Sequence, residues 1–190
     1  IKELSNVKAK EPLVFLKPDT ALISKGRSFF IPNFSKEIHY ELEVVIKIKK
    51  PGRYIERKFS SQYYDEITVG IDFTARDLQK NLREKGHPWE KSKGFDGSTL
   101  VGNFLNKHDL PPISNLNFHL LKNGHTVQNE NTKNMIWPID ELIEHISKFF
   151  TLKIGDLIFT GTPSGVGAVI FEDNLKGFLE GKQLFEINVS

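Results

Sequence analysis

The chain has 190 residues and a mass of 21.7 kDa, which fits one domain of ordinary size, and 38% hydrophobic content with fifteen phenylalanines provides a substantial core. A net charge of +2, from 26 basic and 24 acidic residues scattered along the chain, argues against nucleic-acid binding, and no apolar run approaches the length of a membrane span. Because the chain has no cysteine, any metal must be held by oxygen or imidazole.

The N-terminal part offers weak structural signals. The sequence begins at Ile1 rather than methionine, so we expect a truncated N-terminus, with any targeting segment or further catalytic residue preceding Ile1. Residues 1–11 are polar and lysine-rich and predict a short helix or a mobile segment. Pro12 to Pro18 is read as a short apolar strand ended by proline, and Phe29 to Pro32 leads towards the next strand.

The most informative stretch runs from His39 to Lys49, where apolar and mainly polar residues alternate and predict a strand. One face is apolar, and the other carries Glu41 and Glu43, two positions apart and about 6–7 Å from each other on the same side. Two such carboxylates can share a hard divalent cation such as Mg²⁺. The competing interpretation is an amphipathic strand with a solvated charged face, and the pattern alone leaves both open.

Strands and helices then alternate along the chain. Ile67 to Phe73 predicts an apolar strand with the single acid Asp72, and residues 74–84 predict a helix that stops at Gly86. A hairpin is predicted over Leu116 to Val127, because Asn123-Gly124 is the commonest hairpin turn. Further segments are a helix over Ile139 to Phe149, a strand over Gly155 to Thr160 that feeds the glycine-rich loop Gly161 to Gly167, and a strand over Gln183 to Val189.

Several short motifs occur in a fixed order along nearly the whole chain. Each is weak alone, but their order and spacing resemble the fumarylacetoacetate hydrolase family, in its single-domain branch of acylpyruvate hydrolases and oxaloacetate decarboxylases. The matching segments are EPLVFLKP (11–18), HYELE (39–43), DFTARDLQ (72–79), KGHPW (85–89), KGF (93–95) and GDLIFTGTPSGVG (155–167).

The resemblance implies a fold and a metal site. The expected fold is α+β, predominantly mixed β-sheet, of the β-roll type found in this family, with residues 1–190 forming a single catalytic domain. Glu41, Glu43 and Asp72 are the implied ligands of one Mg²⁺ or Mn²⁺, ions that suit an all-oxygen ligand set better than zinc. Small 2-oxo acids are the implied substrates, and the metal would stabilise the enolate formed when a carbon–carbon bond breaks.

The resemblance also implies substrate-binding side chains, each with a simpler alternative. Lys93 would be a catalytic cation beside the reacting carbonyl, although it could be a surface lysine. Arg76 and Gln79 share a helix face and could bind a substrate oxygen, or Arg76 could pair with an acid such as Glu41. Thr162 is the candidate for the substrate carboxylate, in a loop that could otherwise be a tight turn. Nucleotide binding is excluded because this loop lacks the Lys-Ser/Thr ending of a P-loop.

Water activation is assigned by the resemblance to a His-x-x-Glu pair near the N-terminus. Glu3 would be its glutamate, and the histidine would lie immediately before Ile1. The alternative is an exposed glutamate in a frayed terminus.

We therefore expect a divalent-metal-dependent hydrolase that cleaves acylpyruvates to pyruvate and a carboxylic acid. Oxaloacetate decarboxylation and a 2-hydroxyhepta-2,4-diene-1,7-dioate-type isomerase reaction remain open, as does a non-catalytic metabolite-binding protein. The resemblance further implies a homodimer and a small 2-oxo acid as the ligand. We also expect a cytoplasmic protein, and the charge and hydropathy predict no nucleic-acid or membrane partner.

Overall fold

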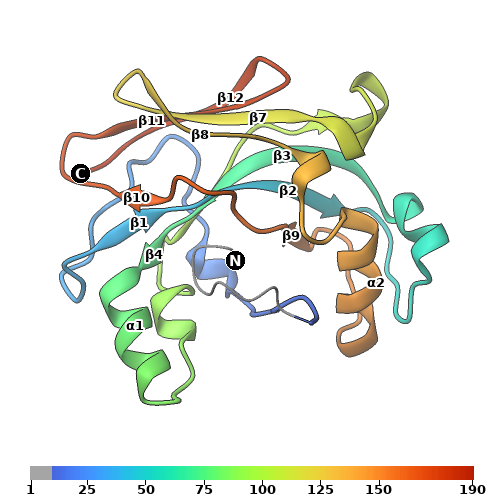
Figure 1. Ribbon diagram of the computed structural model, residues 1–190, viewed down its shortest axis with the longest axis horizontal. Helices are drawn as coiled ribbons and strands as arrows, with labels where there is room; N and C mark the ends of the chain where they lie inside the picture. The colour runs from blue at the N-terminus through green and yellow to red at the C-terminus, as the bar shows by residue number, and fades with distance from the viewer. Residues whose placement is uncertain (1–9) are drawn as a thin grey trace.

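The computed structural model describes residues 10–190, and two curled antiparallel sheets lie at its centre (Figure 1). One sheet has the order β5-β3-β2-β9, with β6 also paired to β3, and the other has the order β12-β11-β7-β8. A small third sheet, β10-β1-β4, continues from the first. The strands are β1 (Ile38–Tyr40), β2 (Leu42–Ile48), β3 (Tyr64–Asp72), β4 (Thr74–Ala75), β5 (Thr99–Val101), β6 (Leu105–Asn106), β7 (Asn117–Lys122), β8 (His125–Asn131), β9 (Leu157–Phe159), β10 (Gly167–Ala168), β11 (Asn174–Leu179) and β12 (Lys182–Asn188).

Helices are few, which confirms the expected α+β class with predominant sheet. The α-helices are α1 (Arg76–Glu84) and α2 (Ile139–Phe149), and the 3₁₀ turns are η1 (Asp19–Ala21), η2 (Arg57–Tyr63), η3 (Glu90–Ser92), η4 (Lys107–Asp109), η5 (Ile113–Asn115) and η6 (Thr132–Asn134). Within residues 10–190, no helix combines the length and apolar character that crossing a bilayer requires.

The core fills the space between the two large sheets. Alternate residues of β2 and β3 point into it, and each fully buried aliphatic side chain contributes about 1.5–3 kcal/mol of transfer free energy. The opposite face of the same sheet is turned towards α1 and α2 (Figure 1). The core members from the two sheets include Leu42, Val44, Ile46, Ile48, Ile67, Val69, Ile71, Leu120, Leu175, Leu179 and Ile187.

The predicted strand over residues 39–49 is divided at Glu41 into β1 and β2. β1 pairs with β10 and β4, whereas β2 pairs with β3 and β9, so the chain passes from one sheet into another at this residue. The amide of Leu42 donates to the side chain of Gln128 at 2.9 Å. A fully solvated charged face is wrong for this segment, because Glu41 and Glu43 are 6% and 5% exposed.

The predicted turn and the two predicted helices are present, but the first helix begins at Arg76 rather than at residue 74, because Thr74–Ala75 form β4. Asn123 and Gly124 both have positive φ, of 51° and 81°, as the two-residue turn between β7 and β8 requires. α2 follows Pro138 and has the bounds that its apolar spacing predicts. α1 ends where expected, and the amide of Gly86 (φ +65°) donates to the Arg83 carbonyl in a left-handed helix cap.

The N-terminal prediction is partly wrong. Pro12 to Pro18 form no strand, and this segment instead runs between α1 and α2 across the face that carries the glutamates (Figure 1). Prolines at both ends lack amide donors, and Leu13 and Leu16 are 60% and 61% exposed rather than packed in a sheet. The helix or mobile segment predicted for residues 1–11 lies almost entirely outside the described residues.

Gly70 and Gly124 are favoured at their positions for different physical reasons. A Cβ on Gly70 would lie 2.4 Å from the Leu100 carbonyl oxygen, whereas Gly124 has open space but a left-handed φ of +81°. We expect Gly70→Ala to lower the free energy of unfolding by more than about 2 kcal/mol, because the sheet must move, and Gly124→Ala by about 1 kcal/mol. Urea unfolding measures both, and equal losses would contradict the steric role of Gly70.

Candidate metal centre

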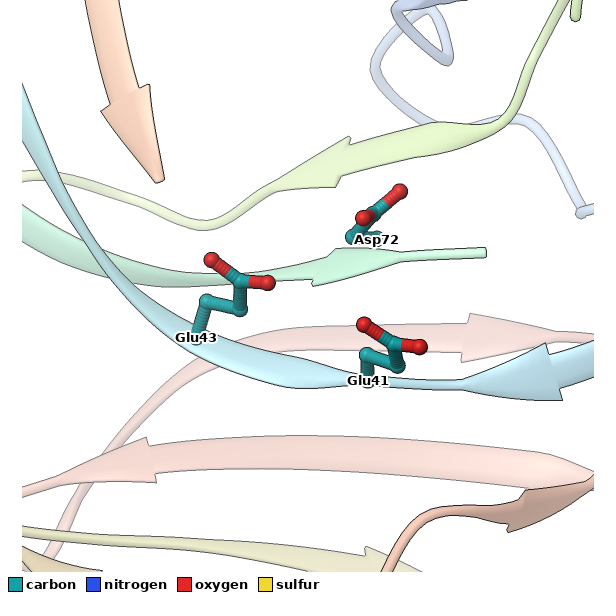
Figure 2. A group of neighbouring side chains, drawn as sticks. All are labelled: Glu41, Glu43 and Asp72. Atoms are coloured by element: carbon teal, nitrogen blue, oxygen red, sulfur yellow. The ribbon is translucent and has the colours of Figure 1, made fainter. Parts of the chain in front are cut away.

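Three acidic side chains converge on the face of the first sheet that is turned away from the core (Figure 2). Glu41 lies at the junction of β1 and β2, Glu43 lies in β2, and Asp72 ends β3. The strand register sets their approach, because Leu42 pairs with Ile71 and the Asp72 amide donates to the Glu41 carbonyl at 2.9 Å. One carboxylate oxygen from each lies within 4.8 Å of the others, and Asp72 is only 1% exposed.

Burying three like charges together is unfavourable, and the buried lysine Lys93 offsets much of that cost. With an effective dielectric constant of about 20, two carboxylate charges at such a separation repel by about 3 kcal/mol. The Lys93 Nζ donates to Glu41 Oε2 at 2.8 Å, to Asp72 Oδ2 at 2.7 Å and to the Thr74 hydroxyl at 2.6 Å. Lys93 is 3% exposed, so the interpretation of a surface lysine is wrong.

The backbone around Lys93 fixes where its ammonium lies. Its amide donates to the Glu90 carbonyl at 2.9 Å, and its own carbonyl accepts the Ser98 hydroxyl at 2.7 Å. Next to it, a Cβ on Gly94 would lie 3.1 Å from Pro18, which explains the close approach of the two segments. Burial alone would lower the pKa of Lys93, but the carboxylates of Asp72 and Glu41 outweigh it and raise that pKa above its usual value.

Two more cations complete the charge balance. Arg76 donates to Glu41 Oε1 at 2.5 Å and to the Gln79 side-chain oxygen at 2.6 Å, so the predicted pairing of Arg76 with Glu41 is present. Lys17, which the sequence analysis did not single out, donates to Asp72 Oδ1 at 2.5 Å and to the Ser98 carbonyl at 3.0 Å. Burial lowers the pKa of Lys17, although Asp72 partly opposes this shift.

The carboxyls of Glu41 and Glu43 respond differently to the same burial. Burial favours the neutral form of Glu41, yet Lys93 and Arg76 together hold its pKa below the usual value. Within the described chain Glu43 has no ion-pair partner, and its Oε2 accepts only the Gly161 amide at 2.6 Å. Burial and the neighbouring Asp72 and Glu41 therefore raise the pKa of Glu43 to about 8.

The glycine-rich loop reaches the centre from β9 and is held by a residue that sequence reasoning missed. The side chain of Gln128, in β8, is 1% exposed. Its amide nitrogen donates to the Thr162 hydroxyl at 2.9 Å and to the Pro163 carbonyl at 3.1 Å, while its oxygen accepts the Leu42 amide. No local pattern marks Gln128, because its partners are distant in sequence.

One cavity of about 1190 Å³ joins these groups, and its wall includes every described candidate residue. Glu3 lies outside the described residues. His39 also lines the cavity and faces Arg76, whose Nε lies 3.4 Å from His39 Nδ1, but His39 does not belong to the acidic cluster. The candidate residues in the wall are Glu41, Glu43, Asp72, Arg76, Gln79, Lys93 and Thr162.

The donor set fits a hard divalent cation. Its atoms are carboxylate oxygens from three side chains, they lie close enough to contact one ion, and β-sheet backbone holds them in place. Few protein ligands are typical for Mg²⁺, which keeps water or substrate oxygens in its remaining positions. The electrostatic cost of the cluster gives a physical reason for a cation at this position.

Comparison with known proteins places the chain in a family. Residues 2–190 match the family model described as fumarylacetoacetate (FAA) hydrolase C-terminal. The chain is 40% identical over 169 residues (88% of this chain, 78% of the relative) to a mitochondrial oxaloacetate decarboxylase of Dictyostelium discoideum. It is 34% identical over 181 residues (95% and 82%) to the mitochondrial oxaloacetate tautomerase FAHD1 of Homo sapiens.

A solved structure shows the same fold with ligands. The fumarylpyruvate hydrolase from Pseudomonas aeruginosa, in complex with Mn²⁺ and pyruvate, superposes with a TM-score of 0.88 at 33% identity, covering 95% of this chain and 79% of that one. The relatives named here are enzymes, and the match extends over nearly all of the chain. The chain therefore belongs to the fumarylacetoacetate hydrolase family.

Proposed function

We propose that Glu41, Glu43 and Asp72 hold a single Mg²⁺ or Mn²⁺ and that the cavity binds a small 2-oxo acid. The observation that carries this proposal is the buried, all-oxygen cluster with its carboxylate atoms within 4.8 Å of one another. When bound, the cation supplies Lewis-acid polarisation of the substrate's 2-oxo group and stabilises negative charge on its oxygen. The Mn²⁺ and pyruvate in the P. aeruginosa relative support the same assignment.

The charge balance of the site favours an enolised 2-oxo acid. Three carboxylates are matched by the three cations Lys17, Arg76 and Lys93, so a divalent cation leaves two positive charges to be matched. A 2-oxo acid supplies one negative charge through its carboxylate, and its enolate supplies the second. The centre is thus closer to neutral with the enolate than with the ground-state substrate, which is the requirement for accelerating enolate formation.

The reaction we assign is hydrolysis of an acylpyruvate to pyruvate and a carboxylic acid. Water adds to the acyl carbonyl, the carbon–carbon bond to the pyruvyl unit breaks, and its electron pair passes into the pyruvate enolate, which a proton then quenches. Lys93 is buried beside the site with a raised pKa, so it stays an ammonium. Its three N–H groups are held by Glu41, Asp72 and Thr74, and its positive charge is assigned to stabilising a developing oxyanion. Arg76, Gln79 and Thr162 are assigned to the substrate's oxygens, and Glu3 is assigned to water activation.

A second candidate is an oxaloacetate reaction, because relatives named for oxaloacetate are 34–40% identical to this chain. Decarboxylation and tautomerisation of oxaloacetate pass through the same enolate but need no attacking water. An isomerase of related 2-oxo acids is a third possibility, and a metabolite-binding protein without turnover is the alternative outside the enzymes. The homodimer and the cytoplasmic location stay predictions.

A turnover panel tests this assignment. We expect acetylpyruvate cleavage that depends on added Mg²⁺ or Mn²⁺, measured as pyruvate release. Glu3→Gln is expected to reduce hydrolysis more than oxaloacetate decarboxylation, because only hydrolysis needs an activated water. Lys93→Gln is expected to reduce both by about 10²–10³-fold, because both develop an oxyanion.

Lys91→Gln is the matched control for Lys93, since Lys91 is two residues away and exposed. Turnover that is unaffected by Lys93→Gln would remove Lys93 from the chemistry. If no 2-oxo acid in the panel is turned over, the metabolite-binding alternative replaces the enzyme.

A substitution at Glu43 separates metal binding from folding. Glu43→Gln keeps the shape and an oxygen for the Gly161 amide, but removes one ligand charge. We expect the affinity for Mn²⁺, measured by calorimetry, to fall at least about 100-fold. Glu66→Gln serves as the control, because Glu66 lies in the neighbouring strand with its side chain 47% exposed. Equal Mn²⁺ affinity in the Glu43 variant and wild type would contradict the proposed ligand role.

The free energy of unfolding of the Glu43→Gln variant should depend on pH differently from that of the wild type. The folded-state pKa of Glu43 is raised from 4.5 to about 8, so the metal-free protein loses stability as pH rises from about 4.5 through 8. In EDTA, Glu43→Gln is therefore expected to match wild type within about 1 kcal/mol near pH 5 and to exceed it by more than about 1 kcal/mol at pH 9. Urea unfolding at the two pH values checks the sign.

Proton release on metal binding follows from the same raised pKa. Below pH 8 the Glu43 carboxyl is protonated in the metal-free protein, and a cation binds its ionised form. Binding at pH 7 is expected to release close to one proton, and the apparent affinity should rise up to about tenfold per pH unit until pH 8. Calorimetry in two buffers of different ionisation enthalpy measures this proton release. If no proton is released at pH 7, Glu43 is not protonated in the metal-free protein.

A further inference from the structure

The cavity that contains the carboxylates extends well beyond them into a region of different character. We call this region the apolar arm. The catalytic end holds the acidic cluster and its cations, whereas the arm is formed by hydrophobic side chains from the N-terminal segment and from α2 with its flanking residues. Residues of the arm are Leu13, Leu16, Trp137, Leu142, Phe149 and Phe150.

α2 carries one apolar stripe, and the two edges of this stripe have different surroundings. Ile139 and Ile143 belong to the core cluster and hold the helix against the sheet. Leu142 and Phe149, seven positions apart and so on one face, line the arm instead. Phe149 is 61% exposed, and Leu13 and Leu16 in the facing segment are 60% and 61% exposed. Exposed apolar side chains gathered in a cavity wall are typical of a ligand site.

Position and charge indicate what the arm accepts. α1, which carries Arg76 and Gln79, and α2 lie well apart below the same sheet (Figure 1), and both contribute residues to the cavity wall. A 2-oxo acid whose carboxylate is held on the α1 side directs its acyl group towards α2. Outside the acidic cluster and its cations, the charged residues of the cavity wall are Asp19, Lys153 and Asp156, which give no net attraction for a second carboxylate. A cavity of about 1190 Å³ also exceeds what a pyruvyl unit with an acetyl group fills.

We propose that the apolar arm binds the acyl group of the substrate and selects apolar acyl chains of several carbons. This inference rests on the proposed 2-oxo acid function and adds the substrate class. The preferred substrates are acylpyruvates such as hexanoylpyruvate, ahead of acetylpyruvate and ahead of substrates that end in a second carboxylate.

The test compares acetyl-, butanoyl- and hexanoylpyruvate on the Mn²⁺-loaded enzyme. Each methylene transferred from water into the arm is worth about fourfold in kcat/KM, so hexanoylpyruvate should exceed acetylpyruvate at least about tenfold. Phe149→Ser should lower the ratio of the two kcat/KM values about fivefold. Phe171→Ser is the matched control, because Phe171 is 65% exposed but does not line the cavity. It should leave the ratio unchanged.

Calorimetric binding of pyruvate, 2-oxohexanoate and 2-oxooctanoate to the Mn²⁺-loaded protein separates the two proposals. If the affinity for these acids rises with chain length but no acylpyruvate is cleaved, the apolar arm is supported as a binding site and the hydrolase assignment is contradicted. If acylpyruvates are cleaved with kcat/KM values that do not depend on chain length, the hydrolase assignment is supported and the proposed role of the apolar arm is contradicted. The apolar side chains would then be assigned to a contact with another protein. An equal effect of Phe149→Ser and Phe171→Ser on the ratio also contradicts the proposed role of the arm.

Discussion

The buried contact of Lys93 with Glu41 and Asp72 is the interaction on which the centre depends. Carboxylates taken out of water lose several kcal/mol of hydration each unless a cation and hydrogen bonds replace it. Lys93 contacts two of the three acids, Arg76 reinforces Glu41, and Lys17 reinforces Asp72. Glu43 is left to the Gly161 amide and takes up a proton more readily than its neighbours. The balance among these groups determines which carboxyl carries the proton when no cation is bound.

The architecture supports this arrangement by separating two tasks between two faces of one sheet. The face towards the second sheet is aliphatic and holds the sheets together, whereas the opposite face presents the acids to the cleft. The junction at Glu41, where the chain passes from the β1 sheet to the β2 sheet, brings Glu41 beside Asp72. Precise spacing of the acids thus comes from backbone hydrogen bonds, which are more rigid than side-chain contacts alone.

Local patterns in the sequence predict the elements well, and tertiary burial explains what they do not predict. Alternation identified Glu41 and Glu43 on one strand face, and the single acid at a strand end identified Asp72. Alternation could not tell a solvated face from a cleft, because the segments that cover this face come from distant parts of the chain. For the same reason Lys17 was hidden in a segment that resembled a strand. Gln128 was missed because its partner Leu42 lies 86 positions away in sequence.

Gln128 also couples the position of one sheet to the position of the glycine-rich loop. Its side chain extends from β8, in the sheet β12-β11-β7-β8, yet it contacts both the start of β2 and the loop that contains Thr162. Besides the shared core, this side chain therefore links that sheet directly to the face that carries the acidic cluster. Shifts of the β7–β8 hairpin, although it lies on the far side of the core, would therefore change the position of Thr162 and Pro163 in the glycine-rich loop.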